Sequence, residues 1–174
     1  MAKEIEFYST VYISIGSNLG DRLVNIQKSI NLIRDRVGVV KDISPIYETP
    51  PLDFEADTLF YNLCISVQTK LNPIEVLNET QKIELELGRS FKTVGNVYSS
   101  RIIDLDIIFF GDLIIDSPRL KIPHPLFCFR KFVLIPLSDI GNDVIDPVSV
   151  KSIHQIIAKC LDKSQLLIVE ASIC

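Results

Sequence analysis

The stretch from residue 100 to residue 112 constrains the fold most, because two acids interrupt an otherwise apolar strand. It reads Ser-Arg-Ile-Ile-Asp-Leu-Asp-Ile-Ile-Phe-Phe-Gly-Asp, and its apolar residues, closed by a Gly-Asp turn, predict a strand buried in the middle of a sheet. Side chains alternate along a strand, so Asp104 and Asp106 should project from one face, roughly 7 Å apart. Leu105 and Ile107 should then point the other way, into the core.

Two carboxylates beside apolar neighbours are costly unless a cation lies between them. Mg²⁺ prefers oxygen ligands, commonly takes one or two protein carboxylates and completes its coordination with water and substrate phosphates. Asp104 and Asp106 are therefore candidate metal ligands. The alternative for such a pair is a solvated strand face whose aspartates pair with lysines.

Length and charge narrow the class of protein. The chain has 174 residues, enough for one domain with a buried core, and 47% of them are hydrophobic. The net charge of −4 argues against a protein that coats nucleic acid or an anionic membrane, so an anionic ligand needs a local basic cluster. No apolar run approaches the roughly 20 residues of a membrane span, and the N-terminus lacks the apolar core of a signal peptide. We expect a cytoplasmic monomer that binds neither nucleic acid nor membrane.

Hydrophobic periodicity divides the chain into strands and helices. It predicts strands over 11–15, 39–47 and 61–69 in addition to the acidic strand, and amphipathic helices over 23–37 and 73–87, each followed by glycine. This order favours an α+β fold with a ferredoxin-like βαββαβ core, an antiparallel sheet and both helices on one face. Residues 113–115 should pair with the acidic strand as a hairpin, and a helix over 148–161 and a strand over 166–169 should form C-terminal additions. We expect residues 1–10 to be an N-terminal extension and residues 11–174 to be one domain.

Basic residues flank the acidic strand on both sides. The planar guanidinium group of arginine suits phosphate oxygens, so acids that bind metal and arginines that bind phosphate predict a nucleotide polyphosphate site. The alternative is a set of solvated surface charges. The flanking basic residues are Arg89, Lys92, Arg101, Arg119, Lys121, His124, Arg130 and Lys131.

Several segments, spread over nearly the whole chain after residue 10, form an ordered set of motifs. They are Tyr12-Ile-Ser-Ile-Gly-Ser-Asn-Leu-Gly, Tyr47-Glu-Thr-Pro-Pro-Leu, Asn62, Gln81 to Arg89, Ser100-Arg-Ile-Ile-Asp-Leu-Asp-Ile, and Ile122-Pro-His-Pro through Arg130-Lys-Phe. This set resembles the 6-hydroxymethyl-7,8-dihydropterin pyrophosphokinase family. The resemblance implies a ferredoxin-like fold and an ATP-dependent diphosphotransferase of folate synthesis. Such an enzyme moves the pyrophosphoryl group of ATP onto the hydroxymethyl group of the reduced pterin, releases AMP and uses two Mg²⁺ ions.

The resemblance also implies roles for residues at matching positions. Asp104 and Asp106 match the metal-binding pair and, with Arg89 and Arg101, form the expected catalytic set. The positions expected to bind ATP are Gln81, Glu84, Arg89, Lys92, Arg101, Ile107, Arg119, His124 and Arg130. Those expected to bind the pterin are Thr49, Pro50, Pro51, Leu52, Phe60, Asn62, Tyr98 and Phe132, with Phe60 and Phe132 on either side of the ring.

Three residues depart from the family pattern. Phe91 stands where many relatives have a basic residue, Tyr98 where many have tryptophan, and Pro125 where tyrosine is frequent. No residue stands out as a general base for the substrate hydroxyl. Two other functions stay open: another Mg²⁺-dependent nucleotide phosphodiesterase or transferase that uses the same acidic pair, and a non-enzymatic ferredoxin-like binding module.

Overall fold

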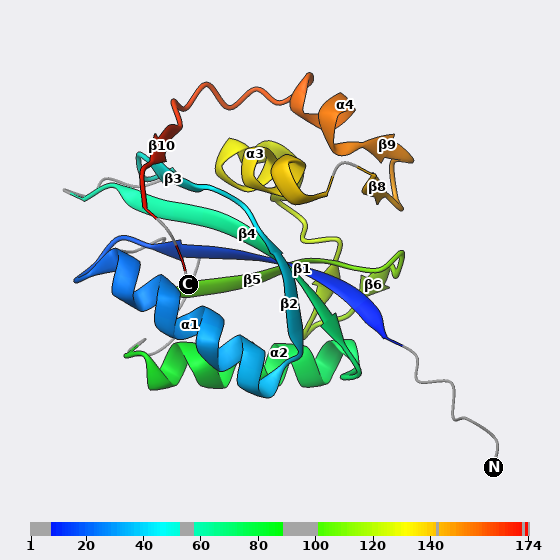
Figure 1. Cartoon of the computed structure of the whole chain (residues 1–174). Helices are drawn as coiled ribbons and strands as arrows, with labels where there is room; N and C mark the ends of the chain where they lie inside the picture. The colour runs from blue at the N-terminus through cyan, green and yellow to red at the C-terminus, as the bar shows by residue number, and fades with distance from the viewer. Residues whose placement is uncertain (1–7, 53–57, 89–100, 142, 172, 174) are drawn as a thin grey trace, which may run out of the picture.

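The computed structural model describes residues 8–52, 58–88, 101–141, 143–171 and 173. In these ranges a six-stranded antiparallel sheet forms the centre of the molecule, and helices lie on both of its faces (Figure 1). The first elements in chain order are β1 (Ser9–Ser17), α1 (Arg22–Arg36), β2 (Val39–Ile43), β3 (Ile46–Thr49), β4 (Phe60–Thr69), α2 (Pro73–Glu86) and β5 (Asp104–Phe110).

The sheet has the strand order β10-β3-β4-β1-β5, in which β10 is the last strand of the chain (Leu167–Val169), and β2 also pairs with β4. Strand β1 is central and pairs antiparallel with both β4 and β5. Its residues Ser14 and Gly16 lie opposite Asp106 and Asp104 of β5. The acidic strand β5 is therefore an edge strand, and its predicted place in the middle of the sheet is wrong, although most of its residues are buried.

The single strand predicted over residues 39–47 is wrong, because the chain forms two strands there. Strand β2 pairs with the later part of β4, and β3 pairs with its first three residues. Between them, Pro45 has no backbone N–H to donate to a ladder. Ser44 instead donates its N–H to the carbonyl oxygen of Cys64, and its hydroxyl oxygen accepts the N–H of Cys64.

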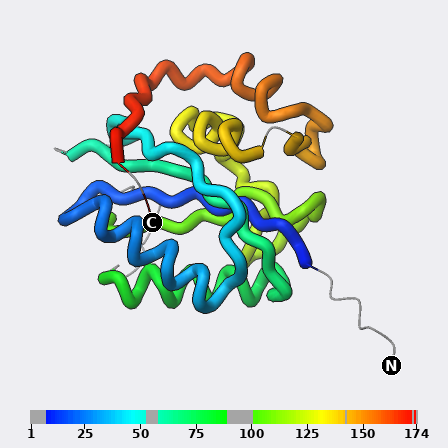
Figure 2. The backbone as a smooth tube through the Cα atoms, in the orientation of Figure 1, coloured from blue at the N-terminus to red at the C-terminus, as the bar shows by residue number. Residues whose placement is uncertain are grey.

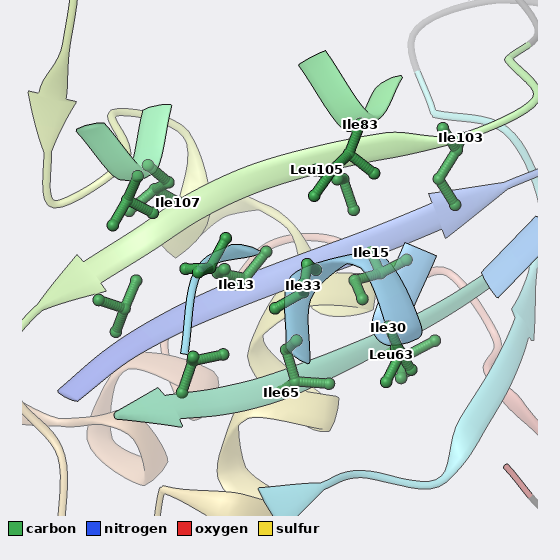
Figure 3. Close-up of a cluster of buried hydrophobic side chains, with 14 of the residues drawn as sticks. Ile13, Ile15, Ile30, Ile33, Leu63, Ile65, Ile83, Ile103, Leu105 and Ile107 are labelled. Atoms are coloured by element: carbon green, nitrogen blue, oxygen red, sulfur yellow. The ribbon is translucent and has the colours of Figure 1, made fainter. Parts of the chain in front are cut away.

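Helices α1 and α2 cover one face of the sheet and begin at the polar residues that cap them. The carboxylate of Asp21 accepts the N–H of Val24 at the start of α1. Asn72 and Glu75 form a reciprocal capping box at the start of α2. Figure 3 shows side chains of both helices packed on the sheet, and the labelled residues are Ile13, Ile15, Ile30, Ile33, Leu63, Ile65, Ile83, Ile103, Leu105 and Ile107. Leu105 and Ile107 therefore face the core as expected.

The opposite face of the sheet is covered by α3 (Lys131–Ile140), which the sequence analysis did not predict. It follows the 3₁₀ turn η1 (Phe127–Phe129) and contains Pro136, a residue that normally disfavours a helix interior. Val133, Leu134 and Leu137 of α3 are buried in a second core cluster against the sheet. Burial of this apolar stripe accounts for the helix despite the proline.

The helix predicted over residues 148–161 is also wrong in extent, because α4 spans only Ile153–Ile157. Val150 has φ 55°, a left-handed conformation that no helix accommodates. Residues on either side of it form the two-stranded ribbon of β8 (Ile145–Asp146) and β9 (Lys151–Ser152). The predicted terminal strand is confirmed as β10 (Leu167–Val169), which pairs with β3. Figure 2 shows the intervening chain crossing above α3 on its way from α4 to β10.

Residues 113–115 do not form a hairpin with β5. The chain turns at Gly111 and then forms a separate ribbon, in which β6 (Ile115–Asp116) pairs with β7 (Lys121–Ile122). The carbonyl oxygen of Ile108, on β5, accepts the N–H of His124 instead. The chain after β7 is thereby fastened to the acidic strand. Across the described ranges, no helix combines the length and the apolar character needed to cross a membrane.

Candidate functional site

A pocket of about 250 Å³ lies where β1, β4 and β5 meet the chain after β3 and the chain before α3. It brings together residues from five separate parts of the sequence. The lining residues are Ser14, Gly16, Thr49, Pro50, Leu52, Phe60, Asn62, Arg101, Asp104, Asp106, His124, Leu126, Arg130 and Phe132. Ser14, Gly16 and Leu126 were not among the predicted site residues, although all three lie in motifs that the sequence analysis quoted.

Asp104 and Asp106 both line the pocket, so the alternation of the strand places them on one face as predicted. A guanidinium nitrogen of Arg101 lies 2.5 Å from Oδ2 of Asp104. Desolvation, followed by repulsion from Asp104, raises the pKa of Asp106 well above the ordinary range of an aspartate. Arg130 and Arg101 act to lower this pKa, but their effect is smaller than that of burial and of Asp104.

This donor set fits Mg²⁺. Carboxylate oxygens are the ligands that Mg²⁺ prefers, and a divalent cation would relieve the repulsion between Asp104 and Asp106. Within the part of the chain that the structure describes, no group of three or more His, Cys, Asp or Glu side chains could hold a metal. Two carboxylates with the remaining positions left to water and phosphate oxygens match the way Mg²⁺ is usually bound.

The positive side of the pocket comes from the segment around η1. Arg130 is buried, and its guanidinium group lies 5.7 Å from the centroid of the Phe132 ring. Burial, with a smaller effect of Arg130, lowers the pKa of His124 to about 4, so its imidazole is neutral near neutral pH. Nδ1 of that ring accepts the N–H of Leu126. The neutral ring then carries its proton on Nε2, which can donate to a phosphate oxygen.

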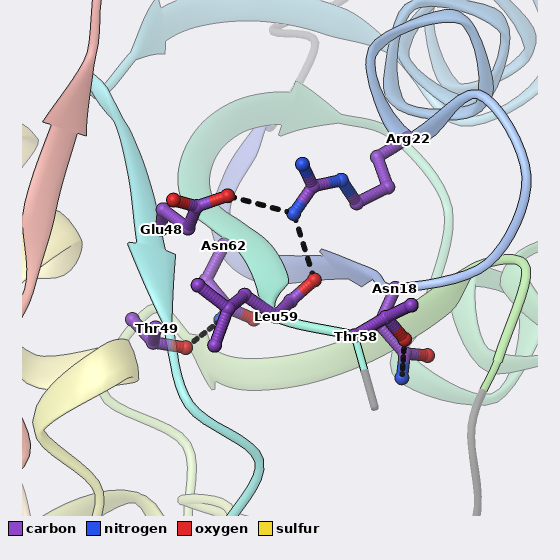
Figure 4. Close-up of polar contacts among 7 residues, drawn as sticks. All are labelled: Asn18, Arg22, Glu48, Thr49, Thr58, Leu59 and Asn62. Carbon is purple, nitrogen blue, oxygen red and sulfur yellow. Dashed lines mark hydrogen bonds and ion pairs between the residues drawn. The ribbon is translucent and has the colours of Figure 1, made fainter. Parts of the chain in front are cut away.

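Asn62 and Thr49 form the polar floor at the other end of the pocket. The side-chain amide of Asn62 is buried and donates to the hydroxyl oxygen of Thr49 over 2.7 Å (Figure 4). A Cβ atom at Gly16 would come within 2.8 Å of Oδ1 of Asn62, so glycine leaves room for the amide. Phe60 and Phe132, which line the pocket from β4 and α3, add apolar surface beside this floor.

Two residues that sequence reasoning did not assign connect the strands that line the pocket to other segments. Arg22 donates to Glu48 and to the carbonyl oxygen of Leu59, and this joins α1 to β3 and to the residue before β4 (Figure 4). Asn18 accepts the N–H of Arg101 with its side-chain oxygen and donates to Thr58. Asn18 belongs to the Gly-Ser-Asn-Leu-Gly motif, which was the available signal.

Several predicted site residues lie elsewhere or outside the described ranges. Glu84 is buried and accepts the N–H of Leu105, Ile107 belongs to the core, and Arg119 donates to Asn78 on α2. Gln81 and Pro51 are partly exposed and do not line the pocket. Their predicted ligand contacts stay predictions. The positions that lie outside the described residues are Arg89, Phe91, Lys92 and Tyr98.

Comparison with known proteins relates this pocket to one family. Residues 12–142 match the family model described as 7,8-dihydro-6-hydroxymethylpterin-pyrophosphokinase (HPPK). The chain is 42% identical over 132 residues to the 2-amino-4-hydroxy-6-hydroxymethyldihydropteridine pyrophosphokinase of Porphyromonas gingivalis, which covers 75% of this chain and 90% of that protein. It is 44% identical over 152 residues to the folic acid synthesis protein fol1 of Pneumocystis carinii, which covers 87% of this chain.

Some of these relatives are much longer than the chain. The match to the Pneumocystis carinii protein covers only 20% of that protein's length. Among solved structures, wild-type Plasmodium falciparum HPPK-DHPS aligns with a TM-score of 0.70 at 17% identity, over 90% of this chain and 45% of that one. At this identity the likeness concerns the fold alone: a mixed α/β architecture built on an antiparallel sheet.

Proposed function

This chain belongs to the 7,8-dihydro-6-hydroxymethylpterin-pyrophosphokinase family, and we propose that it transfers the pyrophosphoryl group of ATP to 6-hydroxymethyl-7,8-dihydropterin. The hydroxymethyl oxygen attacks the β-phosphorus of ATP, the bond from that phosphorus to the α,β-bridging oxygen breaks, and AMP leaves with that oxygen. The hydroxyl proton is released to solvent. The products are the pterin diphosphate and AMP, in a step of folate synthesis.

The observation that supports the proposal is that one pocket contains two sets of side chains, each suited to a different ligand group. At one end lie the paired carboxylates with Arg101, His124 and Arg130, a set suited to phosphates. At the other end lie a buried amide and two phenylalanines, a set suited to a flat, polar-edged heterocycle. A phosphodiesterase or a general nucleotide-binding module has no need of the second set.

We propose that two Mg²⁺ ions are held by Asp104 and Asp106, with water and phosphate oxygens as the other ligands. When bound, Mg²⁺ neutralises phosphate charge and makes the β-phosphorus more electrophilic. Arg130 and the neutral His124 then orient phosphate oxygens, and Arg101 stabilises charge that develops on the AMP leaving group. Arg89 and Lys92 serve as further phosphate contacts. Contacts of Gln81, Glu84, Ile107 and Arg119 with the rest of the nucleotide stay predictions from the family resemblance, because these residues do not line the pocket.

For the pterin, the side-chain amide of Asn62 forms hydrogen bonds with the amide-like edge of the ring. The hydroxyl of Thr49 fixes the orientation of the Asn62 side chain. Phe60 and Phe132 stack on the two faces of the ring. Residues 50–52 and Tyr98 close the remaining side. This arrangement brings the hydroxymethyl group in line with the phosphorus that it attacks, which is the main contribution that positioning makes to phosphoryl transfer.

We also propose that the core is ferredoxin-like and that residues 11–174 act as one domain. Support for this comes from the position of β1 between β4 and β5 and from the shared face of α1 and α2. In that description β2 and β3 together take the place of one strand. The segment after β5 adds α3, α4 and β10 to the core.

The function predicts a strict dependence of AMP formation on the pterin. With Mg²⁺ and ATP labelled either at the α- or at the γ-phosphate, we expect the α-label to appear in AMP and the γ-label in the pterin product. Both signals should vanish when the pterin is left out or the metal is chelated. Separation of products by thin-layer chromatography measures this directly.

Each competing function gives a different result in the same assay. AMP and free pyrophosphate without pterin would indicate a phosphodiesterase. ADP and phosphate would indicate an ordinary ATPase. Binding of ATP without turnover under any condition would indicate a binding module, and each of these results would overturn the proposal.

A further inference from the structure

The first turn of α3 donates its capping hydrogen bond to a side chain that lies far along the chain, Asp162. Arg130 occupies the N-cap position of α3, and its side chain makes no capping hydrogen bond. The N–H of Lys131, in the first turn, donates instead to Oδ2 of Asp162 over 2.8 Å. Asp162 lies in the segment between α4 and β10, beyond the matched residues 12–142.

Asp162 is itself held in place for this contact. Its other carboxylate oxygen, Oδ1, accepts the N–H of Ser164 over 2.8 Å. Partial burial acts to raise the pKa of Asp162, but the hydrogen bonds from Ser164 and Lys131 outweigh it and hold the pKa below the ordinary range. The carboxylate is therefore ionised near neutral pH, and a negative charge at a helix N-terminus is stabilising.

The first turn of α3 is also part of the pocket wall. Arg130 and Phe132 flank Lys131 in sequence, and both side chains line the pocket. The carbonyl oxygen of Arg130 accepts the N–H groups of Val133 and Leu134, so Arg130 is bonded into the same turn. Loss of the cap would loosen the turn that carries both residues.

The segment that contains Asp162 has a second anchor on the opposite wall. After crossing above α3 (Figure 2), it pairs through β10 with β3. In that pairing Leu167 lies opposite Glu48. Strand β3 ends at Thr49 and is followed by Pro50 and Leu52, which line the pocket. The same segment thus contacts α3, which carries Phe132, and β3, whose residue Thr49 accepts the hydrogen bond of the Asn62 amide.

From this geometry we infer that Asp162 is a positioning residue of the active site, which sets the place of Arg130 and Phe132 through the first turn of α3. This inference rests on the proposed function for its kinetic consequence. Asp162 touches neither substrate, and its effect passes through the backbone of Lys131.

The test compares Asp162→Ala with a cap lost elsewhere. Asn72→Ala removes the N-cap of α2, whose first turn does not line the pocket. Each variant should shift the unfolding equilibrium by about fivefold, the usual effect of one lost cap. Only Asp162→Ala should raise the KM for the pterin and the Kd of a non-hydrolysable ATP analogue, each by about tenfold, because only this change displaces site residues.

Two further measurements separate positioning from general destabilisation. Amide hydrogen exchange at Lys131 should become faster in Asp162→Ala and stay unchanged in Asn72→Ala. Asp162→Asn keeps an acceptor oxygen and should restore most of the affinity for both ligands. Wild-type values of KM and Kd in Asp162→Ala, or equal losses in the two cap variants, would overturn the inference.

Failure of the proposed function would give a different pattern. In that case the wild-type protein forms no pterin diphosphate. Hydrogen exchange at Lys131 and binding of the ATP analogue do not require turnover, so their change in Asp162→Ala still tests the positioning role. If wild-type turnover is normal and these two readouts do not change, the positioning role alone is wrong.

Discussion

Replacing Asp106 by asparagine is expected to lower kcat by about 1,000-fold while leaving the protein folded. The substitution keeps the shape of the side chain but removes a charge that we assign to Mg²⁺ binding, and loss of one such transition-state interaction typically costs a factor of about 100 to 1,000. Steady-state kinetics with saturating ATP and pterin measure the loss. Asp116→Asn is the matched control, because this exposed aspartate forms an ion pair with Lys121 and lies outside the pocket.

Stability should move in the opposite direction from activity. Without metal, the carboxylate of Asp106 is desolvated and repelled by Asp104, so the neutral amide should give an equal or higher thermal midpoint. Added Mg²⁺ with an ATP analogue should raise the midpoint of the wild type more than that of Asp106→Asn, since ligand binding to the folded state is stabilising. An unchanged kcat, or equal stabilisation of both proteins, would remove Asp106 from the metal site.

The second large effect is expected from Asn62→Ala, which should lower kcat/KM for the pterin by about 100-fold. The buried amide of Asn62 joins Thr49 to the position proposed for the ring edge, so its removal leaves polar groups on both sides without a partner. Unpaired buried groups cost about 1–3 kcal/mol each, and sites built on hydrogen bonds discriminate strongly for this reason. Steady-state kinetics with varied pterin concentration at saturating ATP measure this loss of kcat/KM. Calorimetry with an ATP analogue should show that the affinity for the nucleotide is unchanged.

Thr69→Val is the control for this second prediction. Thr69 is buried on the same strand, and its hydroxyl donates to the carbonyl oxygen of Val37, far along β4 from the pocket. The variant should lose stability without losing pterin affinity. If Asn62→Ala weakens ATP and pterin to the same degree, or weakens neither, then Asn62 does not recognise the pterin.

The acidic pair shows how much of the site could be predicted from the sequence. Alternation along one strand is enough to place Asp104 and Asp106 on a common face, and the structure confirms this. Periodicity also predicted the helices over 23–37 and 73–87, which the structure has as α1 and α2. These features depend only on local backbone geometry.

The misjudged elements have different causes. The break at Pro45 depends on how β2 and β3 each pair with β4, whereas the left-handed Val150 and the β6–β7 ribbon are local turns that the hydrophobic pattern did not reveal. Helix α3 contains a proline and depends on burial against the sheet. No local pattern carries that information, because register and burial are settled only when the chain closes on itself.

By itself, the sequence determined the acidic strand, the two helices α1 and α2 and, except for the division of residues 39–47 into two strands, the order of elements through β5, because each follows from side-chain periodicity within a short segment. Only the tertiary structure decided that Asn62 meets Thr49, that His124 joins the edge of β5, and that Asp162 caps α3. Such contacts join residues whose separation along the chain says nothing about their distance in space. They form because closing the sheet and burying both of its faces leaves these groups as each other's nearest hydrogen-bond partners.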